Sequence, residues 1–98
     1  MIGVGTTLVL FASWYGPGFH GRITASGTEF NRYAATAAHK SLPFGTRLRV
    51  CHRACEVVTI TDRGPFIPGR SLDLSQGTAE RIGMIDQGVA RIQVTRLD

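Results

Sequence analysis

An aspartate at the end of a strand-like run is the residue in this sequence best placed for proton transfer. Asp62 follows an apolar run that contains Val57, Val58 and Ile60, and it precedes a Gly-Pro turn. The apolar run predicts a buried strand that ends at the turn. A carboxylate at such a junction is fixed by the sheet yet can face a substrate, which suits an acid or base. The structural alternative is an aspartate that hydrogen-bonds the turn backbone.

Two further side chains could act with Asp62. His39 stands before Lys40 and a Leu-Pro-Phe-Gly turn, where it could hydrogen-bond Asp62 or orient a substrate. Alternatively, it is a half-buried histidine that bonds backbone at the barrel end. Arg63 would favour the charged form of the carboxylate if its guanidinium pointed at Asp62. If Arg63 points outward, that effect disappears.

The composition predicts one small globular domain over residues 1–98. Apolar residues make up 43% of the chain and charged residues 18%, which excludes disorder. Glycine contributes 12 of 98 residues, and this supports the tight turns of a small barrel. Residues 1–6 are either the lead-in to a first strand or the remnant of a trimmed leader. They carry no basic residue of the kind that opens a signal peptide, and the apolar stretch is too short to span a bilayer.

The charge of the chain favours anionic surroundings. The formal net charge is +4, and the sequence pI is near 9.8. Nucleic acid, lipid head groups and an acidic cell-wall polymer all remain compatible with this charge. The basic residues are spread without a run of five, so we expect no nucleic-acid partner. We also expect no cofactor, no metal site, no transmembrane segment and a monomeric chain.

The two cysteines, Cys51 and Cys55, flank three residues between two strand-like runs. A hairpin there would bring their Cα atoms into disulfide range. Free thiols and a metal site that includes His52 are the alternatives, although three ligands within five residues do not resemble a structural zinc site. A disulfide is the favoured interpretation and indicates an oxidising compartment. It would add about 2 kcal/mol and mainly fix the hairpin register.

Patterning predicts an all-β chain of about six strands and one short helix, closed into a barrel. Ser75 is the expected N-cap of the helix and Gly83 its end, with Ala79 and Ile82 on the buried face. The segment 24–39 is expected to be mostly loop with one helical turn. The expected strands are 7–15, 47–51, 55–61, 71–74 and 88–97.

Five ordered motifs in this chain resemble the rare lipoprotein A (RlpA) family. The resemblance runs from about Phe11 to Leu97, nearly the whole chain. The motifs are ASWYGPGFHGR (12–22), TASG (24–27), AAHKSLPFGT (37–46), TDRGPF (61–66) and GR followed by LDLS (69–75).

The resemblance implies a six-stranded double-psi β-barrel, related to the catalytic domain of expansins and of family 45 endoglucanases. It implies a periplasmic or outer-membrane-associated setting in a Gram-negative bacterium. Catalytic members of the family are lytic transglycosylases that cleave peptidoglycan strands stripped of stem peptides. The C-terminal peptidoglycan-binding repeat domain of longer members has no counterpart in these residues.

Carried over by motif, Asp62 and His39 match functional positions of the family. The third position, a glutamate directly after Ala-Ser-Gly, holds Thr28 here, and Glu29 follows one residue later. In an extended segment this shift would turn the Glu29 side chain to the opposite face. In a loop, Glu29 could reach the same space and serve as a third catalytic residue. Both outcomes remain open from the sequence.

The implied reaction needs one carboxyl group. The 6-hydroxyl of N-acetylmuramic acid attacks its own anomeric carbon and leaves a 1,6-anhydro ring. One carboxylic acid can protonate the leaving oxygen and then accept the hydroxyl proton, whereas ordinary hydrolysis uses two spaced carboxyls. Asp62 is the candidate for this role. Asp73 is interpreted as structural, a helix cap or a partner of Arg70, with a second site carboxyl as the alternative.

Several side chains could bind sugar around Asp62. Tyr15 and Phe19 adjoin a Gly-Pro-Gly stretch and could stack on pyranose rings, or could instead be core. Hydroxyl and amide groups in the next segment could bond sugar hydroxyls, or could instead form turns. We expect a groove lined by Tyr15, Ser26, His39 and Asp62, with Arg63 at its edge. The full set of expected substrate-binding residues is Tyr15, Phe19, Ser26, Thr28, Asn31 and Arg63.

Three functions are compatible with these residues. The first is a peptidoglycan lytic transglycosylase in which Asp62 is the general acid/base. The second is a noncatalytic module that binds or loosens cell-wall glycan, which Thr28 at the glutamate position favours. The third is a protein-interaction or inhibitor domain that uses the barrel surface. Release of anhydro-muropeptide products separates the first from the other two.

Overall fold

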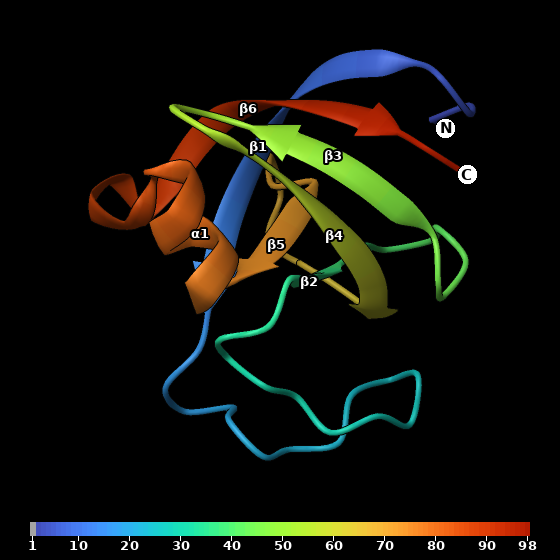
Figure 1. Cartoon of the computed structure of the whole chain (residues 1–98). Coiled ribbons are helices and arrows are strands. Elements are labelled where there is room, and N and C mark those ends of the chain that lie inside the picture. The colour runs from blue at the N-terminus through green and yellow to red at the C-terminus, as the bar shows by residue number, and fades with distance from the viewer. Residues whose placement is uncertain (1) are drawn as a thin grey trace.

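Six strands close into a mixed β-barrel in this computed structural model, which describes residues 2–98 (Figure 1). Around the barrel the order is β1-β5-β2-β4-β3-β6. The pairs β1–β5 and β2–β4 are parallel, and the other four pairs are antiparallel. The elements are β1 (Thr7–Tyr15), β2 (Thr36–Ala38), β3 (Arg47–Cys51), β4 (Cys55–Asp62), β5 (Leu72–Ser75), α1 (Gln76–Ile82), the 3-10 helix η1 (Ile85–Gln87) and β6 (Val89–Arg96).

Alternation along the strands places the core inside the barrel. In β3, Leu48 and Val50 are fully buried and alternate with the exposed Arg47 and Arg49, and β6 repeats this pattern with Ile92 and Val94. The expected buried run before Asp62 is confirmed for Val58 and Ile60, which are inaccessible to solvent. It is wrong for Val57, which is 42% exposed because successive side chains of a strand point to opposite faces.

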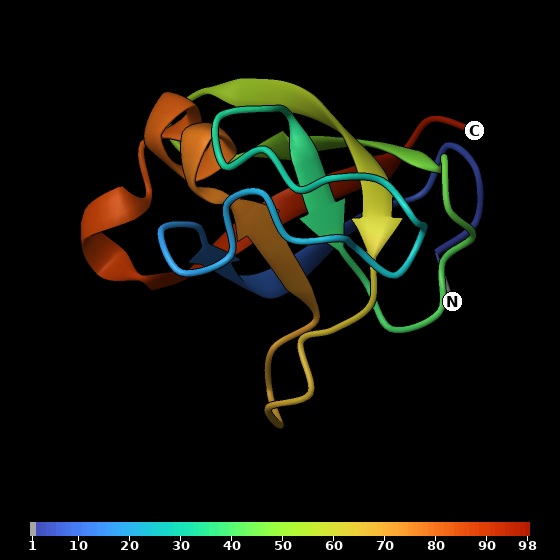
Figure 2. The same cartoon turned by 90° about the horizontal axis from the view of Figure 1, so that it is seen from below.

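Strand β2 is the element that patterning missed. Residues 36–38 were expected to lie in a loop with a helical turn, but they form a three-residue strand between β4 and β5. Two alanines carry little intrinsic strand preference, so pairing on both sides, rather than local propensity, determines this conformation. The connection from Gly16 to Ala35 contains no helical turn; it runs across one end of the barrel (Figure 2).

Helix α1 begins and ends as the sequence predicts. The Ser75 side chain accepts a hydrogen bond from the Thr78 N–H, and Gly83 adopts φ 84° at the C-terminal end. Ala79 and Ile82 are fully buried against the barrel. Gly77 has no room for a side chain, because a Cβ there would lie 2.6 Å from the Tyr33 carbonyl oxygen.

The hairpin tip and the N-terminal residues are also fixed. Cys51 lies opposite Cys55 across β3 and β4, and the two form the expected disulfide.

Residues 2–6 pack on β6, with Ile2 in the core and the Gly5 N–H bonded to the Arg96 carbonyl at 2.7 Å. Met1, part of the segment interpreted as a possible leader remnant, lies outside the described residues. Across residues 2–98 no helix is long and apolar enough to cross a membrane.

Candidate active site

A β-bulge directs Asp62 away from the core. In the β2–β4 pair Ala37 lies opposite Ile60, but Ala38 lies opposite Asp62, so the register skips one residue of β4. Strict alternation would place Asp62 on the core face with Ile60. Because of the skipped residue, Asp62 shares the face of Ala38 instead. Bulges of this kind commonly re-aim a side chain beside a functional site.

Three hydrogen-bond donors hold the Asp62 carboxyl group. Its Oδ1 accepts the backbone N–H groups of Ala25 and Arg63, both at 2.9 Å. Its Oδ2 lies 3.4 Å from the Tyr15 hydroxyl, which donates to it. Rigid backbone donors of this kind stabilise negative charge on the carboxylate. The alternative interpretation, a carboxylate that bonds the turn backbone, therefore describes part of the geometry, but Ala25 and Tyr15 come from distant segments.

A small hairpin, residues 21–30, brings Ala25 to Asp62. Ile23 and Glu29 form an isolated antiparallel bridge, and the Thr24 N–H bonds the Thr28 carbonyl at 2.7 Å. Gly27 closes the turn at φ 89°, a conformation that glycine adopts without steric cost. The Ser26 N–H then bonds the Thr61 carbonyl at 3.1 Å, which docks the hairpin tip on β4.

The register of this hairpin decides the orientation of Thr28 and Glu29. The Thr28 hydroxyl lies 3.0 Å from the hydroxyls of Thr24 and Ser26, on the face turned to the barrel. Glu29 shares the opposite face with Ile23, which is 71% exposed. The Glu29 Oε1 lies 3.8 Å from the place that a Cβ would take on Gly21. The structure therefore does not bring Glu29 to Asp62, and hydroxyls occupy the side where the family motif has a carboxylate.

Tyr15 and two phenylalanines form an aromatic group beside Asp62. Tyr15 stacks on Phe30 with ring centroids 4.5 Å apart and meets Phe19 edge-on at 5.6 Å. Burial, followed by the negative charge of Asp62, raises the pKa of the Tyr15 phenol, so it remains a hydrogen-bond donor at all physiological pH values. Phe30 is almost completely buried, whereas Phe19 is 46% exposed and available to a ligand.

His39 contacts Asp62 by a backbone hydrogen bond, and one of its ring nitrogens faces its own loop. The backbone N–H of His39 donates to the Asp62 carbonyl at 3.2 Å. Its Nδ1 accepts the N–H groups of Ser41 and Leu42 at 3.1 and 3.0 Å, which leaves the proton of the neutral ring on Nε2. Burial and then the charge of Arg63 lower the pKa of His39. The ring is thus neutral at pH 7 and can donate from Nε2.

Arg63 points away from the Asp62 carboxyl. Its guanidinium donates to the carbonyls of Leu42 and His39 at 2.8 and 3.3 Å and lies 3.9 Å from the Phe44 ring centroid. The side chain therefore secures the loop that carries His39, and only its backbone N–H bonds Asp62. The sequence left both orientations of Arg63 open, and the outward one is observed.

The remaining predicted residues divide between the site and the turns. Ser26 lies at the hairpin tip beside Asp62, whereas the Asn31 Oδ1 accepts the Tyr33 N–H at 2.9 Å and acts as a turn former. No enclosed pocket is found in the part of the chain that the structure describes, and the expected groove stays a prediction. Within the same residues no group of three potential metal ligands occurs.

Sequence reasoning missed two contributors to this surface, Ala25 and Phe30. Ala25 contributes through its backbone, so its side-chain type carries no signal. Phe30 closes the hairpin and is buried. In an extended segment residues 28 and 30 lie on the same face, and this period of two could have indicated that Phe30 points toward the barrel.

Comparisons with known proteins identify relatives of the whole barrel. Residues 7–94 match the family model described as lytic transglycolase. A Synechocystis protein named probable endolytic peptidoglycan transglycosylase RlpA is 56% identical over 84 residues, which are 83% of this chain and 26% of that protein. The endolytic peptidoglycan transglycosylase RlpA of Campylobacter jejuni is 45% identical over 97 residues, 96% of this chain and 35% of the relative. The chain thus spans about a quarter to a third of these relatives.

Solved structures share the fold at low sequence identity. The Streptomyces papain inhibitor superposes with a TM-score of 0.79 at 19% identity over the full length of both chains. An expansin from Clavibacter michiganensis superposes with a TM-score of 0.72 at 20% identity, over 95% of this chain and 51% of its own. Since the match to the family model covers every strand but the end of β6, the chain belongs to the RlpA-like lytic transglycolase family and has its double-psi β-barrel fold.

Proposed function

We propose that this chain cleaves peptidoglycan glycan strands as a lytic transglycosylase. The bond is the β-1,4 linkage between N-acetylmuramic acid and N-acetylglucosamine in strands without stem peptides. Asp62 acts as general acid/base. The names of the relatives support the substrate class, and the surface around Asp62 supports the chemistry.

The geometry of Asp62 is the single observation that carries this proposal. A β-bulge turns the carboxyl group out of the core, and donors from three segments fix it. General acid/base catalysis requires a carboxyl held in one orientation within reach of the reacting oxygen.

Neighbouring groups have complementary tasks in the proposed reaction. The Nε2–H of His39 donates to a sugar oxygen, since Nδ1 is already occupied by the loop backbone. The exposed face of Phe19 stacks on a pyranose ring. The open surface suits a long polymer that binds along the barrel end, because an endolytic enzyme must accept a strand with no free end nearby.

Product analysis tests the proposal. Purified chain is incubated with sacculi whose stem peptides have been removed, and soluble 1,6-anhydro products are identified by mass spectrometry. The expected result is release by the wild type and a loss of ~10²–10⁴ in rate for Asp62→Asn, with sedimentation on sacculi retained. A wild type that releases no anhydro product would overturn the enzymatic proposal.

A second candidate function is a noncatalytic module that binds or loosens cell-wall glycan. The observation that favours it is the hydroxyl cluster of Thr24, Ser26 and Thr28 at the position of the family glutamate. Hydroxyls can bond sugar but cannot transfer a proton as a carboxyl does. Sedimentation with sacculi without product release is the outcome that supports this candidate.

The proposed site of action is the periplasm or the outer membrane of a Gram-negative cell. The Cys51–Cys55 disulfide supports an oxidising compartment outside the cytoplasm. A net charge of +4 complements a polymer with lactyl carboxylates. Fractionation of cells that produce the full-length protein tests this location, and recovery in the cytoplasmic fraction would contradict it.

A further inference from the structure

Four neighbouring strands carry a row of residues that links Asp62 to a second carboxyl group. Along β1, β5, β2 and β4 the register pairs Ser13 with Asp73, Asp73 with Ala38, and Ala38 with Asp62. Since neighbouring strands lie ~4.8 Å apart, the Cα atoms of Asp73 and Asp62 are separated by roughly 10 Å. Ala38, with a methyl side chain, is the residue between them in this row. Asp73 faces away from the core, because Leu72 and Leu74 on either side of it are fully buried.

The surroundings of the two carboxyl groups differ in one respect that matters for proton transfer. Asp62 accepts two backbone N–H groups, which are fixed donors. Asp73 receives a single bond of 3.0 Å from the Ser13 hydroxyl and is half-buried. Burial raises the pKa of the Asp73 carboxyl, and the charge of Asp62 raises it further; the Ser13 bond and the cation of Arg70 oppose this.

We propose that Asp73 is a second reacting carboxyl of this site, which protonates the leaving glycosidic oxygen while Asp62 accepts the proton of the attacking hydroxyl. This inference rests on the proposed function, which assigns both proton transfers to Asp62. Here the two transfers are divided between Asp62 and Asp73. Such a division follows the general pattern in which two carboxyls in unlike environments take the acid and base roles.

The proton and bond changes balance. The C1–O4 bond of the glycan breaks, and O4 takes the proton of Asp73. The C1–O6 bond forms as the 6-hydroxyl loses its proton to Asp62. The two residues then exchange protonation states with solvent before the next turnover. Burial, followed by the charges of Asp62 and Asp73, raises the pKa of Tyr15, so its phenol stays protonated beside the two carboxyl groups.

A substrate whose leaving group departs without being protonated distinguishes the acid role of Asp73 from the base role of Asp62. The probe is a muramoyl-terminated denuded oligosaccharide with a 4-nitrophenyl group at its reducing end, compared with the natural polymer. On the natural polymer, Asp73→Asn is expected to lose ~10²–10⁴ in rate. On the 4-nitrophenyl probe, Asp73→Asn should recover to within about tenfold of wild type, whereas Asp62→Asn should remain as slow as on the polymer.

The pH profile supplies a readout that a structural role would not change. The charged and titratable groups that act on Asp73 are Tyr15 on β1, Asp62 on β4 and Arg70 before β5. Ser13→Ala removes a hydrogen bond that lowers the pKa of Asp73. The alkaline limb of the rate profile, where the acid loses its proton, should therefore move to higher pH in this variant. Asp86→Asn, a matched change at an exposed position in η1, should alter neither rate nor profile.

The outcomes distinguish this inference from the proposed function. If wild type releases no anhydro product, both are overturned. If wild type is active and Asp73→Asn is equally active on the polymer, only the Asp73 inference is overturned. The same holds if Asp73→Asn is slow on both substrates by the same factor with an unchanged melting temperature. Asn keeps the shape and can accept the Ser13 bond, and Asp73→Glu provides a second variant that retains the acid.

Discussion

The Tyr15 hydroxyl lies 3.4 Å from Asp62 Oδ2, and this contact joins the end of β1 to the end of β4. The two strands are not neighbours in the barrel, since β5 and β2 stand between them. A side-chain contact across two intervening strands is possible because both residues lie at strand ends on the surface where the Gly16–Ala35 connection crosses the barrel. The contact therefore forms only when the ends of β1 and β4 are held in their observed positions.

Removal of the Tyr15 hydroxyl should affect activity more than stability. Tyr15→Phe keeps the ring stacked on Phe30 but removes one donor to Asp62, a bond of about 1 kcal/mol. We expect the melting temperature to fall by only a few degrees and anhydro-product release to fall about fivefold. Tyr33→Phe, at an exposed ring on the same connection, is the control and should leave the rate unchanged.

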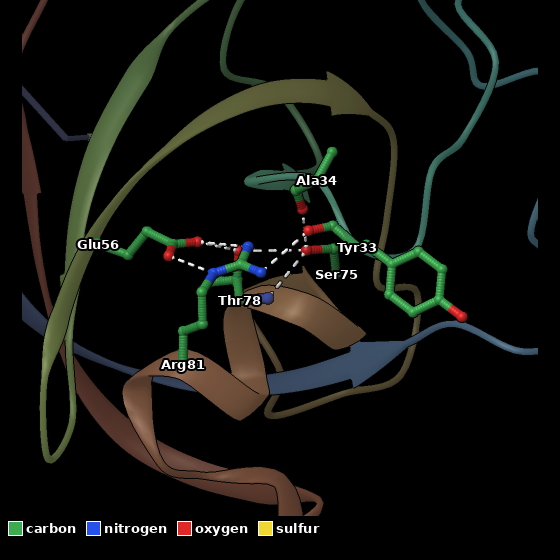
Figure 3. A network of polar contacts seen from close by, with 6 residues as sticks. All are labelled: Tyr33, Ala34, Glu56, Ser75, Thr78 and Arg81. Atoms are coloured by element: carbon green, nitrogen blue, oxygen red, sulfur yellow. Dashed lines mark hydrogen bonds and ion pairs between the residues drawn. The ribbon is translucent and has the colours of Figure 1, made fainter.

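An ion pair between Glu56 on β4 and Arg81 on α1 fastens the helix to the barrel (Figure 3). Arg81 also donates to the Tyr33 carbonyl at 3.0 Å, and the Thr78 hydroxyl donates to Glu56 at 2.8 Å. Glu56→Gln should lower the free energy of unfolding by about 1 kcal/mol at pH 7, a modest value because the Arg81 side chain is 46% exposed. Urea denaturation measures it, with Glu80→Gln, at an exposed helix position, as the control.

The same ion pair predicts a pH dependence. The hydrogen bond from Arg81 holds the pKa of Glu56 below its ordinary value. The unfolded chain thus takes up this proton first as the pH falls, so the stabilisation is complete above the unfolded pKa and is lost as the pH falls from there through the folded pKa. The difference between wild type and Glu56→Gln should accordingly shrink as the pH falls from 5 to 3. A difference that stays constant over this interval would contradict the assignment.

The sequence predicted five of the six strands and the helix because each carries a clear local signal. β3 and β6 alternate, and Ser75 and Gly83 bracket α1 with the expected cap geometry. β2 was not predictable in this way, since three small residues become a strand only when β4 and β5 pair with both of its edges.

The candidate site was predictable only in part, for a similar reason. The position of Asp62 at a strand end followed from the apolar run and the turn. Its orientation depends on a bulge opposite Ala38, which arises from pairing and leaves no mark in residue type. The distance between Asp62 and Asp73 depends on barrel order, which places β2 between β4 and β5. The outward direction of Glu29 required the register of the 21–30 hairpin.

The Cys51–Cys55 disulfide should contribute modestly to stability. It closes a loop of three residues, for which chain entropy gives about 2 kcal/mol. Replacement of both cysteines by serine should lower the free energy of unfolding by about this amount and leave the Asp62 surface active. Mass measurement after alkylation without reductant should show no modified thiol in the native protein; two alkylated cysteines would contradict the pairing.

His39 should make the fold sensitive to mild acid. Its pKa is lowered, first by burial and then by Arg63, so below the ordinary histidine pKa the unfolded chain binds a proton that the folded chain does not. Stability therefore falls as the pH drops through this range. His39→Asn can still accept the Ser41 and Leu42 N–H groups but does not titrate. Between pH 7 and 5 this variant should lose less stability than wild type, as measured by thermal unfolding.

The last prediction concerns Thr28, which stands at the glutamate position of the family motif, and Glu29, which follows it. Glu29 lies on the outward face of the hairpin with Ile23, so Glu29→Gln should leave both anhydro-product release and stability unchanged. Thr28 faces the hydroxyls of Thr24 and Ser26, so Thr28→Glu places a carboxylate on the side of Asp62. We expect this variant to bind sacculi as before and to release product at least as fast as wild type.

The two variants test the two faces of the hairpin separately, because Glu29→Gln removes the carboxyl on the outward face and Thr28→Glu adds one on the opposite face. A loss of ~10² or more in rate for Glu29→Gln would mean that the wild-type Glu29 side chain takes part in the reaction. Glu29 would then have to leave its bridge with Ile23 and turn inward when glycan binds, and the observed hairpin register would not be that of the active enzyme. Loss of activity in Thr28→Glu without loss of stability would show that the hydroxyl cluster itself holds the sugar. Product release and melting temperature, measured on both variants, decide between these outcomes.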